Sequence, residues 1–303
     1  MKRLIRRSNV MNSVKYSELM RRIYGADEDE GEAEGGEDNY ENVSEDVVEA
    51  FNQLIEKLRK TSFNQLPEEL DKVIQDPKLF KLFSKGFGKG NLADVKMTKE
   101  TTAIPVKELH PTQNIIGADK SLNRSLGGDC SHFFKGTVKL GAPIVSYQET
   151  YVIDGHHRWS QVYMINPNGA IESIDFDSKQ DAKQVLRNFQ GAIAKAAGDA
   201  GKSEIPKAGG GDPAQNLLAM SKEAIKQYVT ERISDACWKS IVKATDCTDK
   251  ESVIDYITNN ALEMQKANTN YSSNPPRKSM PQTVSDELGD TPLEIADEGV
   301  TNI

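Results

Sequence analysis

Apolar residues recur at three- and four-residue steps in the first half of the chain, which is the spacing of one face of an α-helix. A helix is predicted over residues 45–60, with Ser44 as its candidate N-cap. Its apolar face consists of Val47, Val48, Phe51, Leu54, Ile55 and Leu58. A second helix is predicted from Pro67 to Gln75, because proline is favoured in a first helical turn.

The same helical spacing returns after residue 177. It predicts helices over residues 178–199, 216–243 and 250–265. Ser221 and Thr248 are candidate caps, and Glu251 stands where a capping box would place its acidic residue.

Between these helical regions the pattern changes to short β-branched and apolar runs, which indicate strands. The runs cover residues 103–109, 143–147, 151–153 and 170–176. A turn at Glu149 and Thr150 would join the second and third runs into a hairpin, and a helix is predicted from Trp159 to Met164. Residues 102–178 are therefore predicted to form a small mixed α/β domain.

The two ends of the chain lack such patterns. Residues 1–25 hold seven Lys/Arg and one Glu, whereas residues 26–46 hold eleven Asp/Glu and no base. The basic stretch is either an amphipathic helix that binds nucleic acid, membrane or an acidic partner, or a disordered arm that the acidic block neutralises. The acidic block is predicted to be a disordered tether. Residues 268–303, polar and proline-containing, are predicted to be a mostly disordered tail.

Together these patterns predict an α+β protein with helices that flank the mixed domain and with disordered termini. The expected parts are an arm (1–46), a helical region (47–101), the mixed α/β domain (102–178), a second helical region (179–267) and a tail (268–303).

Composition narrows the class of protein. The net charge of −8 over 303 residues argues against a general nucleic-acid coat protein. Cys130, Cys237 and Cys247 are an odd number without metal-ligand spacing, which predicts free thiols in a reducing compartment. No apolar run approaches the roughly 20 residues that span a bilayer, and the N-terminus lacks the apolar core of a signal peptide. We therefore expect a cytoplasmic protein without a membrane partner.

The densest chemistry lies at Asp154-Gly155-His156-His157-Arg158, directly after the apolar run 151–153. A strand that turns into a helix leaves free backbone N–H groups at the helix start, and these favour an anion such as phosphate. Gly155 allows a tight turn and a close approach of a ligand. Histidine and a guanidinium add donors at the same point. A zinc site is disfavoured, because adjacent histidines point in different directions.

These residues resemble the signature of the ParB/sulfiredoxin superfamily, in a variant that is similar to its free serine kinase branch. Residues 104–113, Ile-Pro-Val-Lys-Glu-Leu-His-Pro-Thr-Gln, resemble the opening strand and first motif of that domain. Residues 118–122, Ala-Asp-Lys-Ser-Leu, resemble a segment of phage-encoded members. The likeness covers about 75 residues.

The resemblance implies a nucleotide pocket for ATP or ADP, with CTP as an alternative, together with Mg²⁺. It implies that the nucleotide is bound by Gly155, His156, His157, Arg158 and Lys120. Asp154, His157 and Gln113 would serve catalysis, and Asp154 would also hold the metal. The implied activity is phosphoryl transfer to a small-molecule or protein acceptor, or nucleotide hydrolysis.

The chain departs from the kinase pattern at one position. That branch supplies an acidic base after Pro-Thr, where this chain has Gln113, which cannot accept a proton. Glu108, Asp119 and Asp129 are the candidate substitutes. The departure leaves two alternatives open: a phage accessory or virion protein that uses the fold as a scaffold, and a partition- or nuclease-type protein that binds DNA.

Three other features receive weaker predictions. His110 either lines the pocket or faces solvent. A Cys130–His132 dyad is disfavoured by its spacing in a polar loop. Gly209 to Gly211 form either a linker or a flap over the pocket, and a linker is favoured.

Overall fold

The computed structural model describes residues 45–84, 97–283, 287–298 and 303. The described residues belong to two compact units, which are composed of separate stretches of the chain. One unit holds the described residues up to Met97 together with 179–205 and those from Glu287 onward; the other holds 98–178 and 206–286. The basic arm and nearly all of the acidic tether that the sequence predicts lie outside the described residues.

The first unit consists of helices. α2 (Glu45–Lys60), α3 (Leu66–Gln75) and α8 (Ala182–Asp199) confirm the predicted helices, and α4 (Pro77–Ser84) follows α3. α8 packs against α3, α4 and α12 (Thr291–Glu298). The Asp181 carboxylate caps α8 by accepting the Gln184 backbone N–H.

The second unit contains the sheet. Its strands lie in the order β1 (Thr98–Pro105), β6 (Ala170–Asp177), β4 (Ile144–Tyr147), β5 (Tyr151–Asp154) and β2 (His110–Pro111), and β3 (Thr137–Val138) pairs with β6. The β4–β5 hairpin is antiparallel as predicted, whereas β2 runs parallel to β5. The parallel pairing brings the segment after Pro111 to the same edge as the end of β5.

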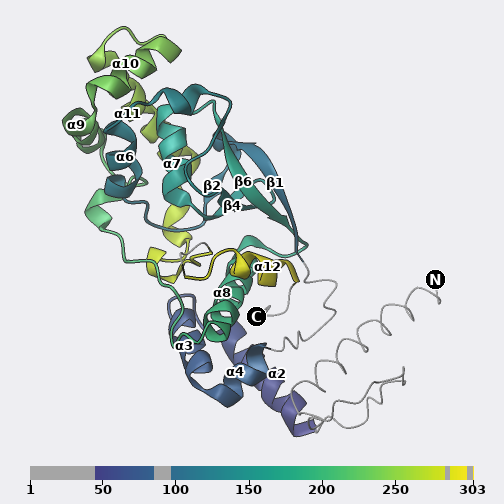
Figure 1. The fold of residues 1–303 in the computed structure, drawn as a ribbon. Helices are drawn as coiled ribbons and strands as arrows, with labels where there is room; N and C mark the ends of the chain where they lie inside the picture. Colours follow the sequence, from purple (N-terminus) through teal and green to yellow (C-terminus); the bar gives the residue numbers. More distant parts are fainter. Residues whose placement is uncertain (1–44, 85–96, 284–286, 299–302) are drawn as a thin grey trace, which may run out of the picture. The chain divides into compact units, whose positions relative to one another are not determined.

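The helices of the second unit pack on one another and, through α7, on the sheet (Figure 1). They are α6 (Ala118–Leu126), α7 (His156–Ile165), α9 (Lys222–Arg232), α10 (Asp235–Ala244) and α11 (Lys250–Ala267). α7 lies at the centre and contacts α6, α11 and three strands. Trp159 is fully buried there, and its indole N–H donates to the Val106 carbonyl oxygen at 2.9 Å.

Several helix limits differ from the predictions. α6 lies in a stretch for which the sequence predicts no helix. The predicted helix 216–243 is two helices, because Ile233 and Ser234 leave the helical conformation and Ser234 caps α10. Ser221 caps α9 as predicted. Thr248 does not cap α11; Asp249 does, in a capping box with Ser252.

The prediction of a disordered tail is wrong for much of residues 268–303. Residues 268–283 follow α11 through two short 3₁₀ turns, η5 (Tyr271–Ser273) and η6 (Arg277–Ser279), and α12 is helical. Met280 and Thr283 are buried, as is Leu293 in α12. Polar composition misled the prediction, because asparagine hydrogen bonds hold residues 268–283 and a few apolar side chains bury α12.

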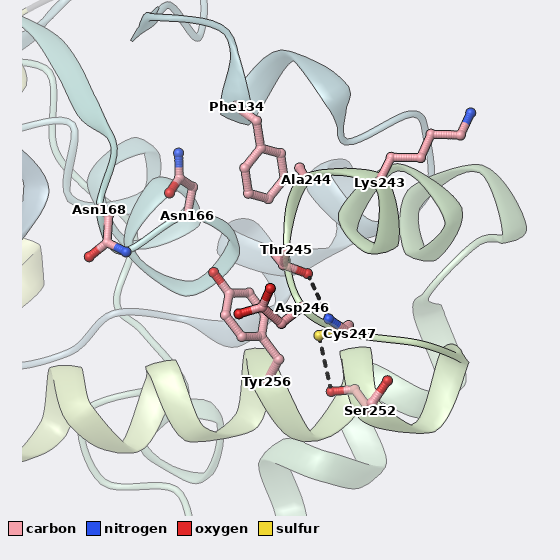
Figure 2. A pocket seen from close by; sticks show the side chains of 10 residues that line it. All are labelled: Phe134, Asn166, Asn168, Lys243, Ala244, Thr245, Asp246, Cys247, Ser252 and Tyr256. Atoms are coloured by element: carbon pink, nitrogen blue, oxygen red, sulfur yellow. Dashed lines mark hydrogen bonds between the residues drawn. The ribbon is translucent and has the colours of Figure 1, made fainter.

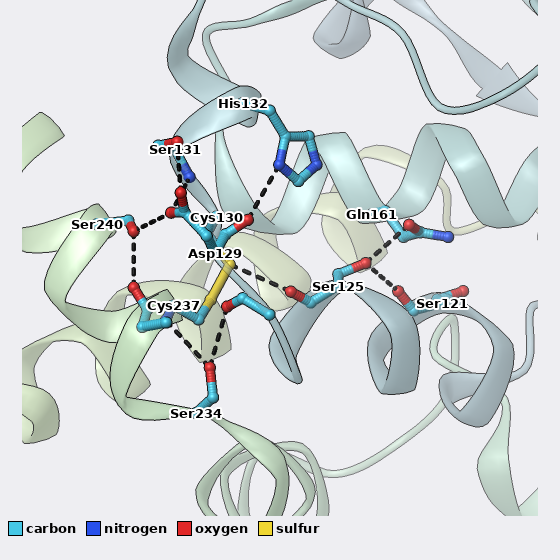
Figure 3. The surroundings of a disulfide bond; sticks show 12 residues. Ser121, Ser125, Asp129, Cys130, Ser131, His132, Gln161, Ser234, Cys237 and Ser240 are labelled. Carbon is cyan, nitrogen blue, oxygen red and sulfur yellow. Dashed lines mark hydrogen bonds between the residues drawn. A yellow bond between two sulfur atoms is a disulfide. The ribbon is translucent and has the colours of Figure 1, made fainter.

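The prediction of three free thiols is also wrong. Cys130 and Cys237 form a disulfide that joins the loop after α6 to α10, and only Cys247 is free (Figure 3). The two cysteines are 107 residues apart in sequence, so their spacing could not reveal the pair. The disulfide removes the support for a reducing compartment. Within the described residues, no helix is long and apolar enough to cross a membrane.

We expect the disulfide to stabilise the second unit. Replacing both Cys130 and Cys237 by serine should lower the free energy of unfolding by about 2–4 kcal/mol, because the bond restricts the unfolded chain. Chemical denaturation measures this, with Cys247→Ser as the control that leaves the bond intact. Alkylation of the denatured protein should modify one thiol without reductant and three after reduction. Three modified thiols without reductant would contradict the pairing.

Candidate functional site

The turn from β5 into α7 has the form that the sequence predicts. Gly155 has φ 90° and ψ 22°, a left-handed conformation that favours glycine, and a Cβ there would lie 2.6 Å from Cγ2 of Ile144. Gly155 is also the N-cap of α7 and offers no side chain to cap it. The first backbone N–H groups of α7 are therefore available to an anion.

His156 faces the core rather than the turn. Its Nε2 accepts the Thr112 backbone N–H at 3.1 Å, and the Thr112 hydroxyl donates to the Val152 carbonyl oxygen at 2.5 Å. Burial, reinforced by the charges of His157, Arg277 and Arg158, holds the pKa of His156 well below its ordinary value. This neutral ring is a structural link, and at the turn His156 offers a ligand only its backbone N–H.

His157 belongs to the first turn of α7, and its side chain contacts α6. Its Nδ1 is 3.0 Å from the Ser121 hydroxyl, which also accepts a hydrogen bond from Ser160 at 2.9 Å. The Nε2 atom is buried and has no hydrogen-bond partner among the described residues. Burial, together with the charges of Arg277 and Lys120 and against that of Asp119, lowers the pKa of His157 to about 4. The neutral ring therefore keeps one nitrogen for a ligand.

The charges of Lys120 and Arg277 act on this ring, and Arg158 follows it in the first turn of α7. Lys120 is exposed on α6, Arg158 is half-buried in the first turn of α7, and Arg277 is half-buried in η6. The Arg158 guanidinium donates to the Ala142 carbonyl oxygen at 2.6 Å, and burial lowers its pKa. The sequence prediction placed Lys120 and Arg158 here but left Arg277 in a disordered tail.

Gly117 lies beside the side chains of Asp119 and His157. Its φ of −70° and ψ of 128° suit any residue, so its backbone conformation does not require glycine. A Cβ at Gly117 would lie 2.6 Å from Oδ1 of Asp119 and 3.8 Å from Cε1 of His157. The Asp119 carboxylate therefore lies where a side chain at Gly117 would begin, and the His157 ring is next to it. The sequence prediction missed Gly117.

Two predicted catalytic residues are engaged in internal hydrogen bonds. Asp154 Oδ1 accepts the Gly155 backbone N–H at 2.6 Å, and Oδ2 accepts the Thr283 hydroxyl at 2.9 Å. Gln113 is buried, and its amide donates to the Ile115 carbonyl oxygen at 2.7 Å. Gln113 thus shapes its own loop instead of pointing its amide N–H groups at a ligand.

The carboxylates near the turn set a limit on metal binding. No group of three His, Cys, Asp or Glu residues with metal-site geometry occurs in the part of the chain that is described. Asp154 supplies one carboxylate. Mg²⁺ is commonly held by one or two carboxylates together with substrate phosphates, so a magnesium ion at Asp154 stays a prediction.

The other sequence candidates lie apart from His157 or are engaged elsewhere. Hydroxyl groups of Ser240 and Ser131 and the Ser131 backbone N–H lower the pKa of Asp129 to about 2, and Asp129 lies beside the disulfide (Figure 3). Glu108 is exposed on the short 3₁₀ turn Val106–Glu108. His110 Nδ1 is 2.8 Å from Asn268 Oδ1, so this histidine holds the segment after α11. The disulfide leaves no Cys130 thiol for a dyad with His132.

The segment after α11 borders the site through four contacts. Asn268 contacts His110, and the Asn274 amide donates to the Pro111 carbonyl oxygen at 2.8 Å. The Asn114 backbone N–H donates to the Pro275 carbonyl oxygen at 3.1 Å, and Thr283 bonds Asp154. These contacts place Arg277 at the site.

The glycine loop at residues 209–211 lies against this segment. A Cβ at Gly211 would lie 2.4 Å from Cγ2 of Ile115 and 3.6 Å from Cδ of Arg277. The loop therefore packs beside the motif segment and Arg277, which goes beyond the predicted role as a linker.

A separate recess of about 700 Å³ lies at the opposite end of α7 (Figure 2). Asn166, the C-cap of α7, lines it together with Phe134, Asn168, Lys243, Ala244, Thr245, Asp246, Cys247, Ser252 and Tyr256. None of the residues predicted for the site takes part. Thr245 and Ser252 already bond backbone groups there.

Comparisons with protein-family models, with curated proteins and with solved structures found no match to this chain.

We expect acid to destabilise the protein through His157. Its pKa is about 4 in the folded state and about 6.5 when unfolded, so the unfolded chain binds more protons between these values. The free energy of unfolding therefore decreases as the pH falls from about 6.5 towards 4, and above pH 6.5 His157 no longer affects it. Arg277→Ala should raise the pKa of His157, because it removes a nearby positive charge.

An NMR titration of the His157 ring measures this pKa directly. Lys278→Ala is the matched control, since it removes an exposed positive charge one residue away. An unchanged His157 midpoint in Arg277→Ala would show that the guanidinium does not act on this ring.

Proposed function

We propose that the chain binds a nucleotide through its phosphates at the β5–α7 turn and catalyses phosphoryl transfer or nucleotide hydrolysis there, as the resemblance to the ParB/sulfiredoxin superfamily implies. The observation that carries the proposal is the buried, unpartnered Nε2 of His157 at the uncapped start of α7, on which the charges of Lys120 and Arg277 act. This local positive charge stands in a chain whose net charge is −8.

The proposed phosphate contacts follow from the available donors. The uncapped start of α7 offers backbone N–H groups, which bind anions well. Guanidinium groups match phosphate oxygens in two-point hydrogen bonds, whereas a lysine ammonium acts as a point charge. A bound phosphate would also offset the cations that depress the pKa of His157, so nucleotide binding should favour protonation of this ring.

Asp119 is the residue we propose as general base. Of the three carboxylates that could replace the missing acidic residue, Asp119 is the one whose charge acts on both His157 and Arg277. It is exposed at the start of α6, and its Oδ1 lies over Gly117 next to the His157 ring. A hydroxyl group that approaches from solvent would meet a carboxylate able to accept its proton.

A second candidate function is nucleotide or phosphate binding without turnover, as in a scaffold or sensor. The internal hydrogen bonds of Asp154 and Gln113 favour it, because they engage two of the residues that the resemblance assigns to catalysis.

Calorimetry with the magnesium salts of ATP, ADP and CTP tests binding. The wild type should bind at least one of them. His157→Ala and Arg277→Ala should each weaken that binding about tenfold or more, because each removes a hydrogen bond to a charged group. Lys278→Ala should bind like the wild type. The proposal is wrong if none of the three nucleotides binds.

Turnover separates the two candidate functions. Asp119→Asn should keep nucleotide affinity and lower phosphate release or transfer by a factor of about 10²–10⁴, the usual range for loss of a general base. Phosphate release by the purified wild type provides the reference, and Asp129→Asn provides the control at a carboxylate beside the disulfide. Tight binding with no release from the wild type would favour the scaffold or sensor.

A further inference from the structure

The side chain of Asn114 carries a second unpartnered polar atom in the same region. Its Oδ1 is buried and has no hydrogen-bond partner among the residues that the structure describes. An unsatisfied buried polar group costs about 1–3 kcal/mol, so such an atom calls for an explanation. Gln113, the neighbour that the sequence prediction selected, satisfies its amide within its own loop.

The backbone of Asn114 is held from two sides. Its N–H donates to the Pro275 carbonyl oxygen at 3.1 Å, and its carbonyl oxygen accepts the Asn216 amide at 2.9 Å. Asn216 also accepts the Ile116 backbone N–H at 3.0 Å, which holds the loop beyond Asn114. These bonds hold the backbone of the loop on both sides of Asn114.

Asn114 and the cations belong to one continuous region. Pro275, which binds the Asn114 backbone, is two residues from Arg277. Arg277 contacts the glycine loop at Gly210 and Gly211, and Gly211 packs against Ile115. The charge of Arg277 in turn acts on His157. The region thus has a cationic end at His157 and a neutral, hydrogen-bond-accepting end at Asn114.

We propose that Asn114 recognises the nucleoside part of the ligand, by accepting a hydrogen bond from a ribose hydroxyl or a base amino group. This inference rests on the proposed function, since it concerns a nucleotide held by its phosphates near His157. A neutral amide oxygen suits a hydroxyl or amino donor and would not attract a phosphate. Asn114 is thereby a specificity-determining residue, distinct from the phosphate-binding cations.

The experiment compares ADP with inorganic pyrophosphate, which lacks the nucleoside, each as its magnesium salt. Calorimetry on the wild type and on Asn114→Leu gives the two affinities, and Asn168→Leu is a control at an asparagine on the turn after α7. Asn114→Leu should weaken ADP binding about tenfold and change pyrophosphate binding less than twofold. Its melting temperature should be equal to that of the wild type or higher, because an apolar side chain leaves no unsatisfied oxygen.

The other outcomes distinguish a failure of the proposed function from a failure of the role of Asn114. If the wild type binds neither ADP nor pyrophosphate, the proposed function is wrong. If the wild type binds both but Asn114→Leu leaves ADP binding unchanged, or weakens both ligands equally, only the role of Asn114 is refuted. Should Asn114→Leu fail to fold, Asn114→Ser and the wild-type preference for ADP over pyrophosphate decide the question. Equal affinities of the wild type for the two ligands would refute the role as well.

Discussion

The arrangement of the site depends on one buried hydrogen bond, between the Thr112 backbone N–H and Nε2 of His156. β2 is only two residues long, and its parallel pairing with β5 offers few backbone hydrogen bonds. The Thr112 hydroxyl adds one more bond to β5, and the imidazole ties the same residue to the first turn of α7. The motif segment from Thr112 onward is thereby held beside the start of α7. A protonated ring could not accept the Thr112 N–H, so burial of a neutral histidine is part of this link.

Two segments that pack beside this link supply the charges around His157. α6 follows the motif segment and brings Asp119, Lys120 and Ser121 towards α7. The segment after α11 binds Pro111 and Asn114 and so adds Arg277. Burial and these cations lower the pKa of His157, and the exposed Asp119 carboxylate offsets part of this effect. A cluster of this kind is electrostatically unfavourable until an anion joins it.

Sequence patterns predicted the parts of this region that are local. The strand before Asp154, the glycine turn and the helix after it follow from apolar runs and from turn chemistry over a few residues. The roles of His156 and His157 could not be predicted, because the two adjacent rings point to different neighbours 44 and 36 residues away in sequence. Arg277 and the Cys130–Cys237 pair were missed for the same reason: each depends on contacts between distant segments. Gly117 was missed for a different reason: its backbone is ordinary, and a side chain there would meet the carboxylate of Asp119.

The two unpartnered atoms, Nε2 of His157 and Oδ1 of Asn114, bear on whether the region is a ligand site or a structural junction. A junction selected for stability alone would replace such groups by apolar side chains, because each unsatisfied polar atom costs about 1–3 kcal/mol. Here the opposite holds: His156 and Gln113, their sequence neighbours, have satisfied side chains, whereas His157 and Asn114 do not. In both pairs one residue fixes the local backbone and the next keeps a free polar atom. That division is what a preorganised ligand site requires, because groups whose directions are already set lose little conformational entropy on binding.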